Sequence, residues 1–289
     1  MEKHFEKLLL CLGKEAYDEI SASKTDFNNV SEIRISANDK IRIFSKKEIV
    51  FEGKKAVSAP ELNNIFAALC EFSVHAYKKE ISEGFITYEG GIRIGICGTA
   101  VYSGEKIEGI KDISALVIRI PHEIRDISNE IVPYLDKGGI LAVGPPCSGK
   151  TTLLRDFSRK TSEKYFVAIV DERREIAAMN RGTPGFDIGK AMVLSGFEKS
   201  EGMKMAVRSL SPEIIICDEF GGEKDLESAM FAMKSGVKIA ASIHAADISD
   251  LKTKPMFRRI AESGIFNTFV FLNRNFEIYK IADIKEIFS

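Results

Sequence analysis

The first apolar positions of the chain recur every three or four residues. This spacing is typical of an amphipathic helix and predicts one helix over residues 1–24. Its apolar positions are Phe5, Leu8, Leu9, Leu12, Ala16 and Ile20. The run Ser58-Ala-Pro-Glu61 then has the pattern of a capping box, which predicts a second helix that ends near Phe72.

A period of two replaces the helical period in the rest of the first 120 residues, and it is typical of strands with one buried face. Asn38-Asp39 and Gly90-Gly91 supply turns, the second with strong hairpin character. The predicted strands cover residues 33–35, 41–43, 85–89, 92–97 and 115–120, and the last of them ends at Pro121. These elements predict a small α+β domain over residues 1–130.

Beyond residue 137 the apolar runs become continuous, at residues 139–143, 165–170, 213–217 and 237–243. Continuous apolar strands are buried on both faces, and helical segments separate these four. The pattern therefore predicts an α/β domain over residues 137–289, with a parallel sheet covered by helices. The polar segment 126–137, which contains one proline, is the predicted linker.

Composition narrows the classes of function. Lysine and arginine number 41 against 42 acidic residues, and the resulting net charge of −1 gives no strong signal of nucleic-acid binding. No apolar run approaches the ~18 residues that span a bilayer, and the N-terminal sequence lacks the apolar stretch of a signal peptide. The five dispersed cysteines fit reduced thiols rather than a zinc site. We therefore expect a cytoplasmic protein that works at a membrane only if a partner recruits it.

Residues 144–151 match the phosphate-binding pattern G-x-x-x-x-G-K-[ST] at every position, between an apolar strand and a predicted helix. Small residues let backbone N–H groups turn toward a β-phosphate, and the helix N-terminus adds its positive end. Lys150 is expected to bind the β- and γ-phosphates of ATP, and Thr151 to bind Mg²⁺. Cys147 is interpreted as a small loop residue. The predicted nucleotide-binding residues here are Gly144, Pro145, Pro146, Cys147, Ser148, Gly149, Lys150, Thr151 and Thr152.

Two further predicted strands end in carboxylates. Asp218 and Glu219 follow the strand over 213–217 in a Walker B pattern, in which one carboxylate holds Mg²⁺ and the other polarises the attacking water. Asp171 and Glu172 end the strand over 165–170. Glu172 is a second candidate for the catalytic base, with Asp171 in support. A surface ion-pair cluster with the arginines that follow is the alternative interpretation.

One histidine and three arginines complete the set of candidates. His244 ends the strand over 237–243, where it either senses the γ-phosphate or has a structural role. Arg208 precedes the Walker B strand and is either a nucleotide-sensing arginine or a solvated charge at a helix end. Arg93 and Arg119 each lie between apolar neighbours on a strand, so their side chains are expected on the sheet face opposite the core.

Taken together, these segments resemble the stage III sporulation AA proteins, a branch of the type II and type IV secretion ATPases found in endospore-forming bacteria. The P-loop alone indicates only an NTPase. The resemblance becomes specific through Val170-Asp-Glu-Arg-Arg-Glu-Ile and through Arg208-Ser-Leu-Ser-Pro-Glu, which precedes Cys217-Asp-Glu-Phe-Gly. Matching segments run from about residue 30 to residue 222.

The resemblance implies an α/β fold with a RecA-like P-loop NTPase domain behind a smaller, PAS-like N-terminal α+β domain. It implies a ring, expected to be a hexamer, with nucleotide held between domains. It also implies membrane subunits of a sporulation channel as partners and a peripheral location on the mother-cell side of that channel.

The resemblance also implies roles for particular residues. Glu172 falls in the segment that secretion ATPases use for the catalytic glutamate, Glu219 at the Walker B acid and His244 in the His box. Arg93 and Arg119 would grip the nucleotide phosphates, a task suited to planar guanidinium groups, and the alternative is that they are two solvated charges. Secretion ATPases usually carry glycine where this chain has Asp218, so the division of roles among Asp218, Glu219 and Glu172 stays open.

The leading hypothesis is an oligomeric ATPase motor that energises a sporulation transport channel. A nucleotide-gated assembly scaffold with little turnover is the alternative. A P-loop kinase would need a lid helix with an arginine-rich face, which the sequence lacks, and a helicase would need a basic channel, which the neutral charge disfavours.

Overall fold

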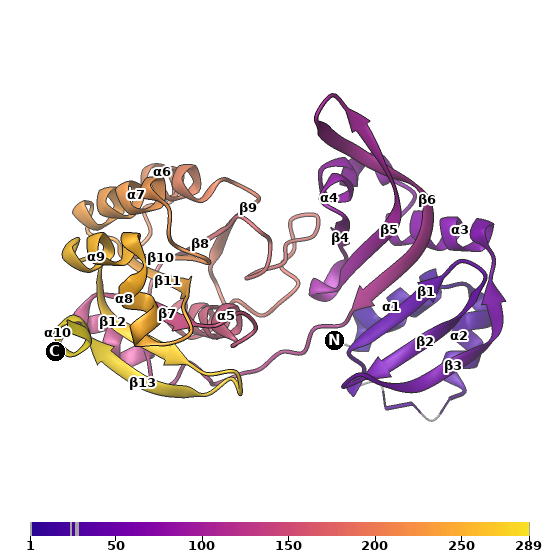
Figure 1. Cartoon of the computed structure of the whole chain (residues 1–289), viewed down its shortest axis with the longest axis horizontal. Coiled ribbons are helices and arrows are strands. Elements are labelled where there is room, and N and C mark those ends of the chain that lie inside the picture. The colour runs from indigo at the N-terminus through magenta and orange to yellow at the C-terminus, as the bar shows by residue number, and fades with distance from the viewer. Residues whose placement is uncertain (1, 24, 27–28, 289) are drawn as a thin grey trace. The chain divides into compact units, whose positions relative to one another are not determined.

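The computed structural model describes residues 2–23, 25–26 and 29–288 of the chain (Figure 1). Residues 1, 24, 27–28 and 289, which the expected domains or the expected first helix included, lie outside this part. The described chain divides into two compact units. One runs through His122 and takes in Met179–Gly185, and the other comprises Glu123–Ala178 and the chain from Phe186 onward. The expected domain boundaries at residues 130 and 137 stay predictions.

In its described residues, the first unit is built on a six-stranded antiparallel sheet in the order β3-β2-β1-β6-β5-β4 (Figure 1). The strands are β1 Glu32–Ser36, β2 Asp39–Ser45, β3 Glu48–Val57, β4 Phe85–Thr87, β5 Arg93–Ser103 and β6 Lys106–Arg119. The helices are α1 Glu2–Cys11, α2 Lys14–Ser21, α3 Ala59–Leu69 and α4 Lys78–Ser82, with short 3₁₀ turns at Val74–Tyr77 and Glu89–Gly91. Apolar residues of all four helices share one buried cluster with alternate residues of the strands, so the helices cover one face of this sheet.

Three elements of this unit test the sequence analysis. The single helix expected over residues 1–24 is wrong, because Gly13 with a φ of 96° separates α1 from α2. The capping box is confirmed, since the Ser58 side chain accepts from the Glu61 N–H and the Glu61 carboxylate accepts from the Ser58 N–H. Strands β5 and β6 continue well past the predicted limits at residues 97 and 115 as an exposed hairpin. Residues 97–108 of this hairpin are all exposed, so no buried face imposes an apolar alternation on them.

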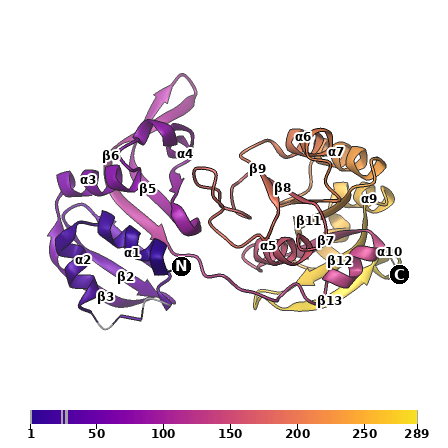
Figure 2. The ribbon, with the colours of Figure 1, turned by 180° about the vertical axis from the view of Figure 1, so that it is seen from behind.

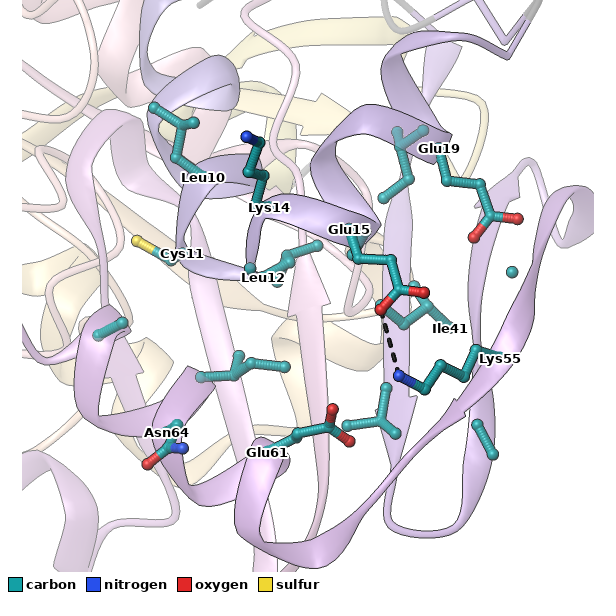
Figure 3. Close-up of a pocket in the computed structure, with 18 of the residues that line it drawn as sticks. Leu10, Cys11, Leu12, Lys14, Glu15, Glu19, Ile41, Lys55, Glu61 and Asn64 are labelled. Carbon is teal, nitrogen blue, oxygen red and sulfur yellow. Dashed lines mark hydrogen bonds and ion pairs between the residues drawn. The ribbon is translucent and has the colours of Figure 1, made fainter.

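A groove of about 600 Å³ opens in this unit among α1, α2, β3 and α3 (Figure 3). Leu12, Ile41 and Phe51 are among its apolar lining, and the ion pair between Lys55 Nζ and Glu15 Oε2, 3.2 Å long, lies at its edge.

In its described residues, the second unit has a seven-stranded sheet in the order β13-β12-β7-β11-β10-β8-β9. All neighbours are parallel except β12 and β13, which pair antiparallel at one edge. The strands are β7 Gly139–Gly144, β8 Val167–Asp171, β9 Met192–Ser195, β10 Ile214–Cys217, β11 Lys238–His244, β12 Phe266–Leu272 and β13 Ile278–Asp283. The predicted parallel sheet is confirmed for β7, β8, β10 and β11, whereas β9, β12 and β13 were not predicted.

Helices cover both faces of this sheet. They are α5 Lys150–Thr161, α6 Lys199–Ser209, α7 Glu223–Lys234, α8 Ile248–Thr253, α9 Pro255–Glu262 and α10 Ile284–Phe288, with a 3₁₀ turn at Val132–Lys137. One buried cluster joins alternate strand residues, such as Leu141 and Ile215, to α6, α7 and α9, and α6 and α7 lie side by side (Figure 2). Helix α5 packs on the central strands but is absent from that cluster, which places it on the other face.

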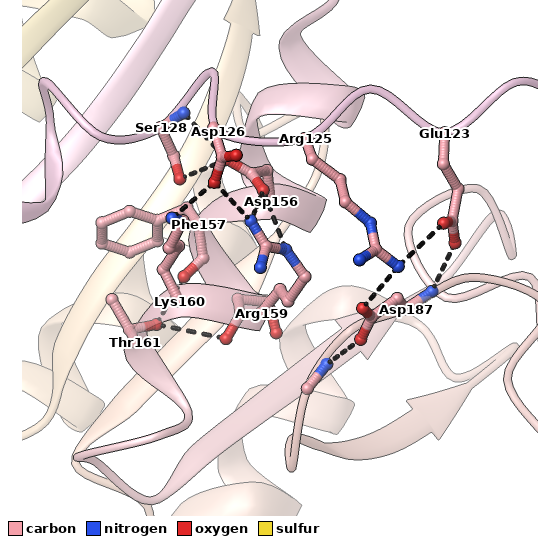
Figure 4. Close-up of polar contacts among 12 residues, drawn as sticks. Glu123, Arg125, Asp126, Ser128, Asp156, Phe157, Arg159, Lys160, Thr161 and Asp187 are labelled. Atoms are coloured by element: carbon pink, nitrogen blue, oxygen red, sulfur yellow. Dashed lines mark hydrogen bonds and ion pairs between the residues drawn. The ribbon is translucent and has the colours of Figure 1, made fainter.

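The segment expected as a linker is fixed to α5 (Figure 4). The Asp156 carboxylate on α5 accepts from the Ser128 N–H at 2.9 Å and from Ser128 Oγ at 2.6 Å. Asp126 pairs with Arg159 at 3.0 Å and with Lys160 at 2.5 Å. These ion pairs and the burial of Ile131 tie residues 126–137, the segment predicted as a linker, to the second unit.

Candidate functional site

The P-loop leaves the end of β7 and returns as the start of α5. Two residues of the loop have a positive φ, in the left-handed region of backbone conformation: Cys147 at 61° and Gly149 at 87°. At Gly144 an added Cβ would lie 2.4 Å from Ser148 Oγ and 3.0 Å from Leu272 O, so only glycine fits. Ser148 Oγ is buried and has no hydrogen-bond partner among the described residues. A buried hydroxyl without a partner is costly, and it marks the inside of the loop as a place for a polar ligand.

Lys150 is buried at the start of α5, and its ammonium group has three acceptors. Nζ donates to Gly144 O at 2.9 Å and to Pro145 O at 2.8 Å, and it lies 3.0 Å from His244 Nδ1. Burial lowers the pKa of Lys150, and the nearby carboxylates of Asp218 and Glu219 act against this. A lysine ammonium has donors only, so His244 Nδ1 must be the acceptor, and the histidine proton lies on Nε2.

His244 carries this chain of contacts on to the Walker B acid. Its Nε2 lies 3.0 Å from Glu219 Oε1, so the imidazole N–H donates to that carboxylate. The second oxygen of Glu219 pairs with Arg173, which follows β8. Lys150, His244, Glu219 and Arg173 therefore form one connected row across the carboxyl ends of β7, β11, β10 and β8.

Asp218 makes a second link between the Walker B strand and the P-loop. Its Oδ2 accepts from the Thr151 hydroxyl, and its Oδ1 accepts from Ser242 Oγ and from the Glu219 N–H at 2.9 Å. Ser242 lies on β11, two residues before His244, so both side chains project from the same face of that strand. Thr151 and Asp218 place a hydroxyl and a carboxylate side by side, which is a donor set suited to Mg²⁺.

Glu172 lies beside this row without joining it directly. Its Oε2 is 3.7 Å from Nζ of Lys199, a buried lysine at the start of α6. The same Nζ donates to Glu219 O at 2.7 Å and lies 3.5 Å from Asp225 Oδ2. Lys199 therefore connects Glu172 to the backbone of the Walker B segment.

Asp171 holds the loop that carries Glu172. It is buried and accepts from the N–H groups of Glu175, Ile176 and Ala177 at 2.8–3.1 Å. Burial raises the pKa of Asp171, and these N–H bonds act against the rise. Arg155 of α5 secures the same loop, since its guanidinium donates to Ile176 O at 2.8 Å and to Glu175 O at 2.7 Å. Burial lowers the pKa of Arg155 to about 10.

The structure brings together most of the predicted site residues of the second unit. Arg208 does not join them within one copy, because it lies in the last turn of α6, just before β10 begins. The P-loop and the acids lie at the carboxyl ends of the strands, whereas Arg208 lies near the amino end of β10. The sequence did not single out Lys199 or Ser242, and it offered Arg173 only as a member of a surface ion-pair cluster. The period-two spacing of Ser242 and His244 could have indicated Ser242, whereas no local pattern marks a buried lysine.

Arg93 and Arg119 belong to the first unit. They are direct partners in the antiparallel pairing of β5 with β6, next to the fully buried Ile94 and Ile118. Their expected position on the open face of the sheet is confirmed. Arg93 stacks 3.8 Å from the Phe85 ring centroid, and Arg119 is 73% exposed, with Glu32 Oε2 4.0 Å away. Two like charges directly opposite on neighbouring strands repel each other, which makes this pair unusual.

A profile of the protein family described as Sporulation stage III, protein AA matches residues 3–287. The chain belongs to this family. Stage III sporulation protein AA of Bacillus subtilis (strain 168) is 34% identical over 255 residues, which cover 85% of this chain and 83% of that protein. Protein SEEDLING PLASTID DEVELOPMENT 1 of Arabidopsis thaliana is 34% identical over 135 residues, 44% of this chain and 20% of the plant protein.

Solved structures add the fold. The Legionella pneumophila ATPase DotB superposes with a TM-score of 0.58 at 13% identity, covering 90% of this chain and 76% of DotB. The pilus retraction motor PilT with bound ADP gives a TM-score of 0.58 at 15% identity, covering 84% of this chain and 74% of PilT. The predicted α/β fold with a RecA-like P-loop domain is thus confirmed for this member of the sporulation family. Among the described residues, no helix combines the length and apolarity that a membrane crossing requires.

Proposed function

We propose that this chain binds ATP at the loop over residues 144–151 and hydrolyses it with Mg²⁺. The observation that carries the proposal is the pair of links from the P-loop to the Walker B acids, from Thr151 to Asp218 and from Lys150 through His244 to Glu219. The first link joins two oxygen ligands suited to Mg²⁺, and the second joins a lysine suited to phosphate to a carboxylate suited to orient water.

The residues fit a triphosphate in two respects. Ser148 Oγ is buried without a partner among the described residues, and Lys150 holds a buried positive charge. Exchanging backbone carbonyls for phosphate oxygens would strengthen the Lys150 contacts, because hydrogen bonds between charged groups are the stronger kind.

Thr151 Oγ1 and an Asp218 oxygen would hold Mg²⁺. When bound, the metal ion supplies positive charge that stabilises the phosphate oxygens as the terminal P–O bond breaks. Ser242 keeps Asp218 turned toward Thr151 by donating to its other oxygen.

Glu219 is the proposed base that orients the attacking water. His244 lies between the Glu219 carboxylate and Lys150 and contacts both, so this carboxylate faces the end of the site where a γ-phosphate would lie. Glu172 is the second candidate, because Lys199 ties it to the same segment and its side chain is 41% exposed to solvent. His244 is the proposed γ-phosphate sensor, since it contacts both Lys150 and Glu219.

We propose that copies of this chain assemble into a ring, expected to be a hexamer. This ring is the motor that energises a sporulation channel between mother cell and forespore. Membership of the sporulation stage III family and the fold shared with DotB and the motor PilT support this. The proposed partners are membrane subunits of that channel, and the proposed location is cytoplasmic, at the mother-cell side of the membrane.

The alternative is a nucleotide-gated scaffold with little turnover. Steady-state ATP hydrolysis, measured against protein concentration and alongside the oligomeric state, separates the two. A specific activity that rises as oligomers form supports the motor. Tight ATP binding without turnover at any concentration supports the scaffold and overturns the motor.

A further inference from the structure

An aromatic ring lies against the P-loop. Phe276 belongs to the turn between β12 and β13, and its Cδ1 would be 3.0 Å from a Cβ added at Gly149. The residue is 57% exposed, so much of this side chain faces solvent. Burial in a core therefore does not explain why a phenylalanine occupies this place.

The backbone of the turn holds Phe276 in an unfavourable conformation. Its φ is 66°, in the left-handed region that bulky side chains rarely adopt. Asn273 fixes the turn, because its Oδ1 accepts from the N–H groups of Asn275 at 2.8 Å and Glu277 at 3.1 Å. Its Nδ2 also donates to Glu277 Oε2 at 2.9 Å. Strain that the surroundings hold in place at an exposed aromatic residue points to a function for that residue.

The strand order tells which end of a nucleotide would face this ring. The P-loop follows β7. Strands β11, which ends at His244, and β10, which ends just before Asp218, lie on one side of β7. The terminal phosphate is expected on that side, next to the Walker B acids. The rest of the nucleotide must then leave on the other side of β7, where β12 and β13 pair and Phe276 projects.

We propose that Phe276 is a base-binding residue, which stacks its ring on the purine of the nucleotide. This inference rests on the proposed ATP binding and adds to it the contact that distinguishes a nucleotide from a bare polyphosphate. Aromatic rings stack on any nucleobase through their faces, so the contact favours nucleotides as a class and selects weakly among bases.

Two ligands separate the base from the phosphates in a binding experiment. Isothermal titration of the full-length chain with ATP and with inorganic tripolyphosphate compares Phe276→Ala with wild type. Phe166→Ala is the matched control. Phe166 is a 68% exposed phenylalanine in the same unit, and it lies at the amino end of β8, away from the P-loop. Loss of one base stack is expected to weaken ATP binding by about tenfold in Phe276→Ala, to leave tripolyphosphate unchanged, and to leave the control unchanged for both.

A spectroscopic readout follows from the composition, because the sequence contains no tryptophan. Phe276→Trp introduces a single indole whose fluorescence should change with ADP or ATP and stay constant with tripolyphosphate. Phe166→Trp should respond to neither.

The outcomes are distinguishable. Equal ATP affinity in Phe276→Ala and wild type overturns the base contact alone. Parallel losses for ATP and tripolyphosphate also overturn it, because Phe276 would then act only by shaping the loop at Gly149. A wild-type chain that binds neither ligand overturns the proposed function and this inference with it.

Discussion

Lys150 and His244 share a hydrogen bond 3.0 Å long between Nζ and Nδ1. All three N–H groups of the lysine are used, two of them on carbonyls of its own loop. A phosphate oxygen that binds Lys150 must therefore replace one of these acceptors. If it replaces His244, the histidine and Glu219 are free to rearrange. Phosphate binding at Lys150 would then change the position of the Glu219 carboxylate at the end of β10.

Lys150→Ala is predicted to abolish measurable ATP binding, a loss of about a hundredfold or more. Hydrogen bonds to charged groups contribute about 1.5–3 kcal/mol each, and no other ammonium contacts this loop in the described residues. Titration with ATP measures the loss, with Lys164→Ala, an exposed lysine just beyond α5, as the control. Hydrolysis at the native rate by Lys150→Ala would refute the assignment of the P-loop.

Glu219→Gln is predicted to bind ATP with nearly native affinity and to lower kcat by about 10²–10⁴-fold, the range for a lost general base. The amide keeps the shape of the side chain but cannot take up a proton from water. Single-turnover hydrolysis and ATP titration of the variant measure the two effects. Glu172→Gln is the comparison. If it is the slow variant while Glu219→Gln turns over normally, the role of the base belongs to the loop after β8.

Arg119→Ala is predicted to lower ATP hydrolysis by at least about tenfold, as expected if its guanidinium grips phosphate oxygens. The side chain is 73% exposed and its ion pair with Glu32 is long, so the melting temperature without nucleotide should move by no more than about 2 °C. Arg34→Ala is the matched control, because Arg34 lies on the same sheet face and pairs with the same Glu32. ATP hydrolysis at the native rate by Arg119→Ala would show that Arg119 takes no part in catalysis.

Asp156→Asn is predicted to reduce the free energy of unfolding by about 2 kcal/mol at pH 7, since the carboxylate accepts from Ser128 and Arg159 in a buried position. Burial by itself would raise the pKa of Asp156, but the hydrogen bonds from Ser128 and Arg159 prevail and the pKa lies below its ordinary value.

The sign of the pH dependence follows from that lowered pKa. The unfolded state takes up the proton first as pH falls, so the stabilisation is present above about pH 4 and is lost at lower pH. Urea unfolding at pH 7 and at pH 3 should show a wild-type advantage over Asp156→Asn that shrinks at pH 3. Asp136→Asn, at an exposed position of the same segment, serves as control. A difference that stays constant between the two pH values would contradict the prediction.

Local patterns in the sequence were sufficient for the elements with a strong period. The apolar runs of β7, β8, β10 and β11 predicted the central sheet because strands buried on both faces have no polar side to interrupt them. The capping box at Ser58 and the P-loop were equally readable, since each places particular residue types at fixed spacing for a local backbone reason. The break at Gly13 was missed because the apolar period continues across it.

What the sequence determined is therefore the kind of sheet, the loop and the strand ends that carry acids. Only the tertiary structure decided how those ends meet. It links Thr151 to Asp218 and Lys150 to Glu219 through His244. It places Arg208 near the amino end of β10, away from these residues. It also buries Lys199 between Glu172 and the Walker B segment and sets Phe276 against Gly149. These residues are tens of positions apart in the chain, and their contacts depend on strand order and register, which no local period encodes.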